Sequence, residues 1–124
     1  MHNCLNVVTG PESYPAALLI RAVEPLEGVD AMRAGNARPG IADARLAAGP
    51  GLVGAAFGVT RADTGTDLAD PASPFRLEAR RGGEPAPRVV TGPRVGIAYA
   101  GEPWTSRPWR FAVGGSPALS RRIG

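Results

Sequence analysis

Two residues that could do chemistry interrupt apolar segments of this sequence. Arg21 follows the run Ala17–Ile20, and Asn6 stands between Leu5 and Val7. A guanidinium donates two hydrogen bonds to one oxyanion, but it is costly to bury unless it is paired and hydrogen-bonded. The functional interpretation is contact with a ligand. The structural alternatives are a strand-end pair of Arg21 with Glu24 and a satisfied core amide for Asn6.

Acid–base groups are scarce. General acid–base catalysis needs a carboxylate or histidine held close to the substrate. The only histidine, His2, lies at the chain end, where a surface role is expected, and Glu24 directly precedes Pro25, where capping or pairing is expected. With one His and one Cys, Cys4, the sequence offers no internal disulfide and no metal-ligand cluster. We therefore expect no cofactor and no metal.

Two motifs favour contact with nucleic acid. A glycine-rich segment starts a helix at Gly49 and Pro50, where free backbone N–H groups and the helix dipole favour phosphate, although it lacks the GK[ST] of a P-loop. The segment RPWRF mixes Arg with Trp, which suits stacking and backbone contacts. The alternative places Trp104, Trp109 and Phe111 in the core.

The charge pattern agrees with an anionic partner. The net charge is +3, all 14 basic side chains are Arg, and the pI is near 10. This is compatible with nucleic acid, but codon usage in a GC-rich genome is the favoured explanation of the all-arginine basic set. No apolar stretch approaches the roughly 20 residues needed to span a bilayer, and no secretory signal precedes the first strand. A cytoplasmic protein without a membrane partner is expected.

The elements that position these residues are short. The 124 residues suit one α+β domain, with a curved, mainly antiparallel, barrel-like sheet covered by short helices. A hairpin is predicted first, from strands at 2–9 and 15–24 around GPESYP. The remaining expectations are helices at 28–35, at 41–47 and after Gly49-Pro50, strands at 75–80, 93–101 and 109–115, polar loops at 60–74 and 80–88, and a closing helical turn at 116–122.

Four segments in order resemble one known family. They are MHNCLNVVT (1–9), LLIRAVEPLEG (18–28), AAGPGLVGAAFGVTRADTGTDL (47–68) and PRVGIAYAGEPWTSRPWRFAVGGSPALS (93–120). Together they resemble the C-terminal half of the alkyladenine, or 3-methyladenine, DNA glycosylases. By this resemblance, residues 1–124 are the C-terminal part of such a domain, which would be incomplete.

The resemblance implies a function in base-excision repair. Family members flip a damaged purine out of the duplex and hydrolyse its N-glycosidic bond. Their substrates include 3-methyladenine, 7-methylguanine and hypoxanthine. The implied partner is double-stranded DNA containing damaged purines, and the implied state is a monomer associated with the nucleoid in the cytoplasm.

The resemblance also assigns roles to residues. Arg21 matches an Arg that helps to hold the attacking water, and Asn6 matches an Asn that obstructs the exocyclic amine of normal guanine. Polar interruptions of apolar strands are what a polar pocket floor requires. Family members often carry a basic residue where this chain has Leu52. The other assignments are Val95 at the pocket edge, and Met1, His2, Gly49, Pro50, Arg94 and Gly96 against DNA.

Other family residues lie before the matched segments. A Tyr-Gly pair directly precedes the M-H-x-C-x-N run, and its Tyr is the wedge that fills the gap in the duplex. The catalytic Glu and the stacking Tyr and His lie further upstream. Met1 is therefore interpreted as an internal methionine, and this chain alone is expected to have little or no glycosylase activity. The alternatives are a non-catalytic nucleic-acid-binding module and a remnant that binds nothing.

Overall fold

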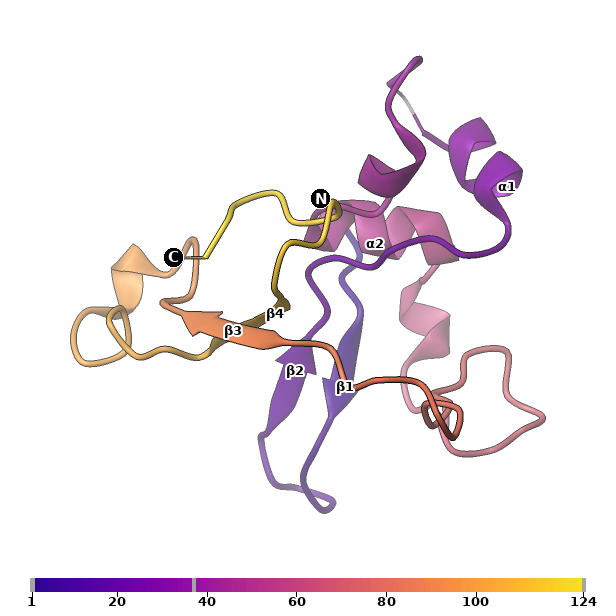
Figure 1. The fold of residues 1–124 in the computed structure, drawn as a ribbon. Helices are drawn as coiled ribbons and strands as arrows, with labels where there is room; N and C mark the ends of the chain where they lie inside the picture. Colours follow the sequence, from indigo (N-terminus) through magenta and orange to yellow (C-terminus); the bar gives the residue numbers. More distant parts are fainter. Residues whose placement is uncertain (1, 37, 124) are drawn as a thin grey trace.

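The fold is a small α+β arrangement, as the sequence predicts. The computed structural model describes residues 2–36 and 38–123, drawn in Figure 1. The strands are β1 (Asn6–Val8), β2 (Ala17–Leu19), β3 (Val89–Gly92) and β4 (Arg110–Val113), and the α-helices are α1 (Val29–Ala34) and α2 (Pro50–Phe57). Three 3₁₀ turns are η1 (Asp43–Arg45), η2 (Arg61–Asp63) and η3 (Ala98–Ala100).

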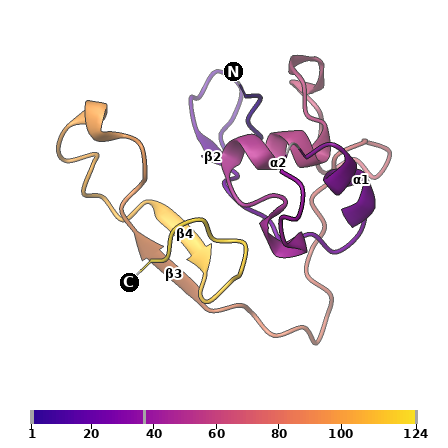
Figure 2. The same cartoon turned by 90° about the horizontal axis from the view of Figure 1, so that it is seen from above.

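The strands form two separate antiparallel pairs, so the expectation of one barrel-like sheet is wrong for the described residues. β1 pairs with β2, and β3 pairs with β4. Figure 2 shows the β3–β4 ribbon on one side of the molecule and the two helices on the other. Because neither pair adds a third strand, no sheet is wide enough to curve into a barrel.

Two predicted strands are absent from their expected positions. In the segment 93–101, Gly96 and Gly101 adopt φ values of +76° and +66°. Backbone at such angles turns away from the extended conformation of a strand, and η3 forms there instead. In 75–80, the Leu77 N–H donates to the Leu68 carbonyl of the preceding loop at 2.9 Å. The partner of β4 is therefore β3, directly before Pro93.

The N-terminal hairpin and both α-helices are confirmed. The N–H of Thr9 donates to the carbonyl of Ala16, and the N–H of Ile20 to that of Leu5, both at 3.0 Å, which extends the β1–β2 ladder. α2 begins at Pro50. Proline is well suited to this position, because the first N–H groups of a helix have no partner within the helix and proline has no N–H to leave unpaired. The patch expected at 41–47 is only the short η1, since its last residues run on in an extended bridge from Ala22 to Ala48.

A small core lies where α2, the segment after η1 and the C-terminal residues meet. Its buried apolar side chains are Leu46, Ala47, Ala48, Val53 and Ala118. Arg45 ties the C-terminal segment to η1, because its Nη1 donates to the Leu119 carbonyl at 2.7 Å. The closing segment, residues 116–122, forms one hydrogen-bonded turn, in which the N–H of Leu119 donates to the carbonyl of Ser116. None of the helices in the described ranges is long and apolar enough to cross a membrane.

Candidate functional site

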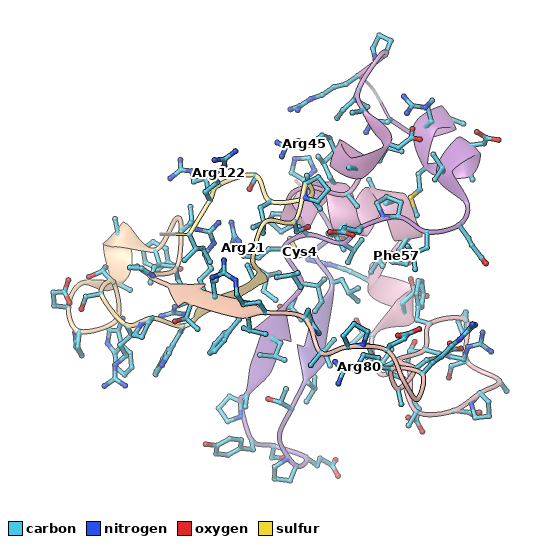
Figure 3. All side chains as sticks on the ribbon, in the orientation of Figure 1. Cys4, Arg21, Arg45, Phe57, Arg80 and Arg122 are labelled. Carbon is cyan, nitrogen blue, oxygen red and sulfur yellow. The ribbon has the colours of Figure 1, made fainter. Side chains whose placement is uncertain are left out.

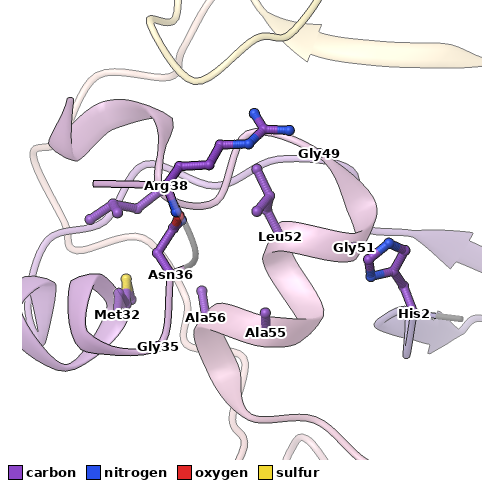
Figure 4. Close-up of a pocket in the computed structure, with 11 residues that line it drawn as sticks. His2, Met32, Gly35, Asn36, Arg38, Gly49, Gly51, Leu52, Ala55 and Ala56 are labelled. Atoms are coloured by element: carbon purple, nitrogen blue, oxygen red, sulfur yellow. The ribbon is translucent and has the colours of Figure 1, made fainter. Parts of the chain in front are cut away.

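Two cavities divide most of the predicted site residues between them. The first, of about 440 Å³, lies between α1 and α2 and is lined by His2, Gly49 and Leu52 among others. Figure 4 shows these side chains around the first turn of α2. A Cβ added to Gly51 would lie only 2.9 Å from Cγ of His2. The imidazole therefore packs directly against the backbone of the first turn of α2. Three predicted DNA contacts, His2, Gly49 and Pro50, therefore lie together. Met1 lies outside the described residues.

The second cavity, of about 470 Å³, gathers the other predicted group. Arg94, Val95 and Gly96 line it together with arginines from β4 and from the C-terminal segment. We call this cavity the arginine cleft. Its described lining residues are Pro93, Arg94, Val95, Gly96, Ile97, Ala98, Thr105, Arg110, Arg121 and Arg122.

The arginine cleft is strongly positive. No Asp or Glu side chain is among the described residues that line it. Arg110 is half-buried and donates a hydrogen bond from Nη2 to the carbonyl of Arg121. Its burial, and then the charges of Arg21 and Arg121, lower the pKa of Arg110. Among the residues that the structure describes, like charges therefore lie together with no carboxylate in the lining of the cleft, an arrangement that favours an anionic ligand.

Arg21 belongs to this positive region. Its side chain is half-buried, and within residues 2–36 and 38–123 it makes no ion pair. The structural alternative, a pair with Glu24, is not formed, and Glu24 instead accepts a hydrogen bond from Oγ of Ser116 at 2.5 Å. Figure 3 labels Arg21 in the centre of the molecule, with Arg80 far from Arg122 across the β1–β2 hairpin.

Asn6 lies on the same face of the hairpin as Arg21. The register pairs Asn6 with Leu19, and side chains alternate along a strand, so Leu19 and Arg21 share the face of Asn6. Asn6 is exposed, so the alternative of a core amide is wrong. It lines neither cavity. Asn6 and Arg21, the two polar residues that interrupt apolar segments, therefore lie on one face of the hairpin. Asn6 does not line the cavity that contains Val95.

The sequence interpretation missed the basic residues Arg110, Arg121 and Arg122. The feature of the sequence that could have identified them is the uneven distribution of charge along the chain. Residues 93–122 contain five arginines and one glutamate, a net charge of +4, whereas residues 1–92 carry nine arginines and ten acidic residues. The whole positive excess therefore belongs to the last quarter of the chain.

The alternative that placed the aromatic side chains in the core is also wrong. Trp104 and Trp109 are 43% and 46% exposed, and Phe111 is 64% exposed. The guanidinium of Arg107 lies 5.0 Å from the ring centre of Trp104 and 4.8 Å from that of Trp109. Among the described residues no group of three or more His, Cys, Asp or Glu could hold a metal ion.

Comparison with known proteins finds one family. The model of the methylpurine-DNA glycosylase family matches residues 1–117. The chain is similar to a Nocardia farcinica protein named "Putative 3-methyladenine DNA glycosylase", with 45% identity over 97% of this chain and 54% of the relative. Proteins of the same name from Nitrosospira multiformis and Rhodopseudomonas palustris are each 46% identical, over 98% and 97% of this chain and 57% and 54% of their own lengths. The chain spans about half the length of these relatives.

Proposed function

The chain belongs to the methylpurine-DNA glycosylase family, and we propose that it functions in base-excision repair. The reaction is hydrolysis of the N-glycosidic bond of an alkylated or deaminated purine, such as 3-methyladenine, 7-methylguanine or hypoxanthine. The family match over residues 1–117 carries this proposal. The partner is double-stranded DNA, from which the damaged base must be flipped before its bond can be reached. The protein acts as a monomer on the DNA of the nucleoid, in the cytoplasm.

Arg21 and Asn6 form the reactive face in this proposal. Arg21 holds the attacking water, and its guanidinium, which forms no ion pair with residues 2–36 or 38–123, is available to do so. Asn6, exposed on the same face of the hairpin, obstructs the exocyclic amine of normal guanine. Val95, which lines the arginine cleft, is assigned to the edge of the base pocket on the family resemblance alone.

Two surfaces hold the DNA backbone. At the first, Gly49 and Pro50 open α2, an eight-residue helix whose N-terminal N–H groups face the backbone with His2 beside them. At the second, Arg94 and Gly96 line the arginine cleft. Met1 is assigned to the first surface on the family resemblance alone.

We assign the general base to residues outside this 124-residue stretch. Within the described residues no carboxylate forms an ion pair with Arg21. Glu24, three positions further on, already accepts the Ser116 hydroxyl hydrogen bond. A missing acid–base group typically lowers a rate by about 10²- to 10⁴-fold. We therefore expect this chain alone to hydrolyse the bond at least about 100-fold more slowly than a relative of full length.

A chimera tests the proposal. Residues 1–117 replace the matched segment of the Nocardia farcinica relative, and single-turnover release of hypoxanthine from duplex DNA is measured for the chimera, for the relative and for the 124-residue chain. We expect the chimera to be active. Arg21→Gln in the chimera lowers the rate of base release from bound DNA by about 100-fold, and the matched control Arg80→Gln, far from Arg122 of the arginine cleft, leaves that rate unchanged.

Two results would contradict the proposal. A chimera that shows the circular dichroism of a folded protein but releases no base refutes the function. A 124-residue chain that matches the relative's rate refutes the placement of the general base. A second candidate, a nucleic-acid-binding module without chemistry, is favoured by the charge of residues 93–122. It predicts an inactive chimera that still binds DNA with no preference for lesions.

A further inference from the structure

The two tryptophans of the chain form one exposed cluster with Arg107. The ring centres of Trp104 and Trp109 are 5.8 Å apart, and the ring planes are inclined by 48°. Arg107 packs against both rings. Nearly half of each ring system remains open to solvent. What sets this pair apart from the other exposed apolar side chains is its contact with arginines, which suits a binding surface.

Arg94 joins this cluster to the arginine cleft. Its guanidinium lies 5.3 Å from the ring centre of Trp109, and the same residue lines the cleft with Arg110, Arg121 and Arg122. Aromatic and cationic groups therefore form one continuous surface, which we call the Trp–Arg surface.

The single acidic residue of this region does not neutralise the surface. Glu102 is the only Asp or Glu between residues 93 and 122. Its two carboxylate oxygens accept hydrogen bonds from the hydroxyls of Thr105 and Ser106, each at 2.5 Å. The carboxylate stays charged but forms no ion pair with an arginine among the described residues, and the five arginines of residues 93–122 outnumber it.

The combination of exposed indole rings and arginines is complementary to a ligand that carries both phosphates and accessible aromatic faces. Arginines that converge on a cleft bind phosphate oxygens. Exposed indole rings stack on nucleobases, but only when the base is unpaired, since a duplex hides both base faces. A protein partner with acidic side chains would use the arginines and leave the rings without a matching group.

We propose that the Trp–Arg surface binds single-stranded nucleic acid, with a backbone phosphate in the arginine cleft and an unpaired base stacked on Trp104 or Trp109. This binding is independent of damaged bases and of hydrolysis, so it goes beyond the proposed glycosylase function. It gives the chain a place to hold unpaired nucleotides apart from the face that carries Asn6.

Tryptophan fluorescence tests the stacking directly, because both tryptophans of the sequence belong to the surface. The 124-residue chain is titrated with an undamaged oligothymidine, with a duplex, and with inorganic phosphate at matched ionic strength. We expect saturable quenching by the single strand. The duplex and free phosphate produce little quenching, because neither offers an unpaired base.

Variants separate stacking from charge. Affinity for a fluorescently labelled oligothymidine is measured by anisotropy at several salt concentrations. Trp104→Ala and Trp109→Ala each weaken binding by about 5- to 100-fold and leave the salt dependence unchanged. The negative slope of log K against log salt becomes shallower in the double variant Arg121→Gln, Arg122→Gln, by about 0.7 for each phosphate that the protein no longer neutralises. The matched double variant Arg80→Gln, Arg81→Gln changes neither quantity.

Several results would overturn the inference. They are the absence of quenching by the single strand, equal quenching by the duplex, quenching by phosphate alone, and equal salt slopes for the two double variants. Circular dichroism of each variant confirms that it keeps the fold of the parent. The outcome does not depend on base release, so a failure here leaves the glycosylase proposal standing, and an inactive chimera leaves this inference standing.

Discussion

At the scale of single residues, arginines without carboxylate partners distinguish this molecule. The pKa of Arg110 is lowered by its burial and then by the charge of Arg21, so these two arginines lie close together. Among the described residues two arginines form ion pairs, Arg33 with Asp43 and Arg76 with Glu78. Neither ion pair involves an arginine of the arginine cleft, so the cleft keeps its positive charge, which suits an anionic ligand.

Glu102 provides a prediction at this scale. The hydroxyls of Ser106 and then Thr105 stabilise its ionised form and lower its pKa from the ordinary 4.5. A carboxyl whose folded pKa lies below its unfolded pKa stabilises the fold above the unfolded value, and that contribution is lost as the pH falls through the folded pKa. We expect the carboxyl carbon of Glu102 to titrate below 4.5 when it is followed by NMR.

Removal of the hydroxyls is the control for this titration. Ser106→Ala raises the midpoint of Glu102 toward its ordinary value, and Thr105→Val raises it by less, because the Ser106 hydrogen bond is the larger cause of the shift. A midpoint that neither variant moves would contradict this account.

At the scale of elements, close contact between α2 and the N-terminal segment holds the first cavity in shape. A Cβ placed on Gly54 would lie 1.8 Å from the carbonyl oxygen of Asn3, so only glycine allows this approach. His2 crosses the same helix one turn earlier, at Gly51. The position of the predicted DNA contacts at the start of α2 therefore depends on backbone packing and not on side-chain charge.

Gly54→Ala tests this packing. The added methyl group forces the N-terminal segment away from α2, and we expect the free energy of unfolding to fall by about 1–3 kcal/mol. Gly82→Ala is the matched control, because a Cβ there has open space and the backbone is not in the left-handed region. Urea unfolding followed by circular dichroism measures both variants. Equal stabilities of the two would show that the segment does not pack as described.

At the scale of the whole molecule, the chain is open. Its accessible surface is 9279 Å², whereas a compact monomer of 12.8 kDa exposes about 6,300 Å². Thirteen large hydrophobic side chains of the described residues are more than two-fifths exposed, from Val8 in β1 to Val113 in β4. The small core around Leu46 and Val53 therefore supports two sheets whose faces are mostly uncovered.

This openness predicts a shallow unfolding transition. The urea m-value grows with the surface that unfolding exposes. Taking about 1.45 Å² per dalton for the unfolded chain, we expect this chain to have an m-value about three-quarters of that of a compact domain of equal mass. A urea titration of the 124-residue chain measures it. An m-value typical of a compact domain would mean that the sheet faces are covered in solution.

Local signals in the sequence determined several features. The hairpin follows from alternating apolar residues around a loop, and the start of α2 follows from Gly49-Pro50, because these preferences act over a few neighbouring residues. The concentration of positive charge in residues 93–122 and the family resemblance also needed no coordinates. The family match then confirmed the resemblance over residues 1–117.

Only the tertiary structure decided which distant segments meet. β4 takes β3 as its partner and not the segment 93–101, because glycines with positive φ turn that segment away. The same choice sets Arg110 opposite Gly92 and brings it into the cleft of Arg94. Strand pairing and side-chain exposure depend on contacts between residues far apart in sequence. For that reason the exposed tryptophans and the arginine cleft could not be predicted from local patterns.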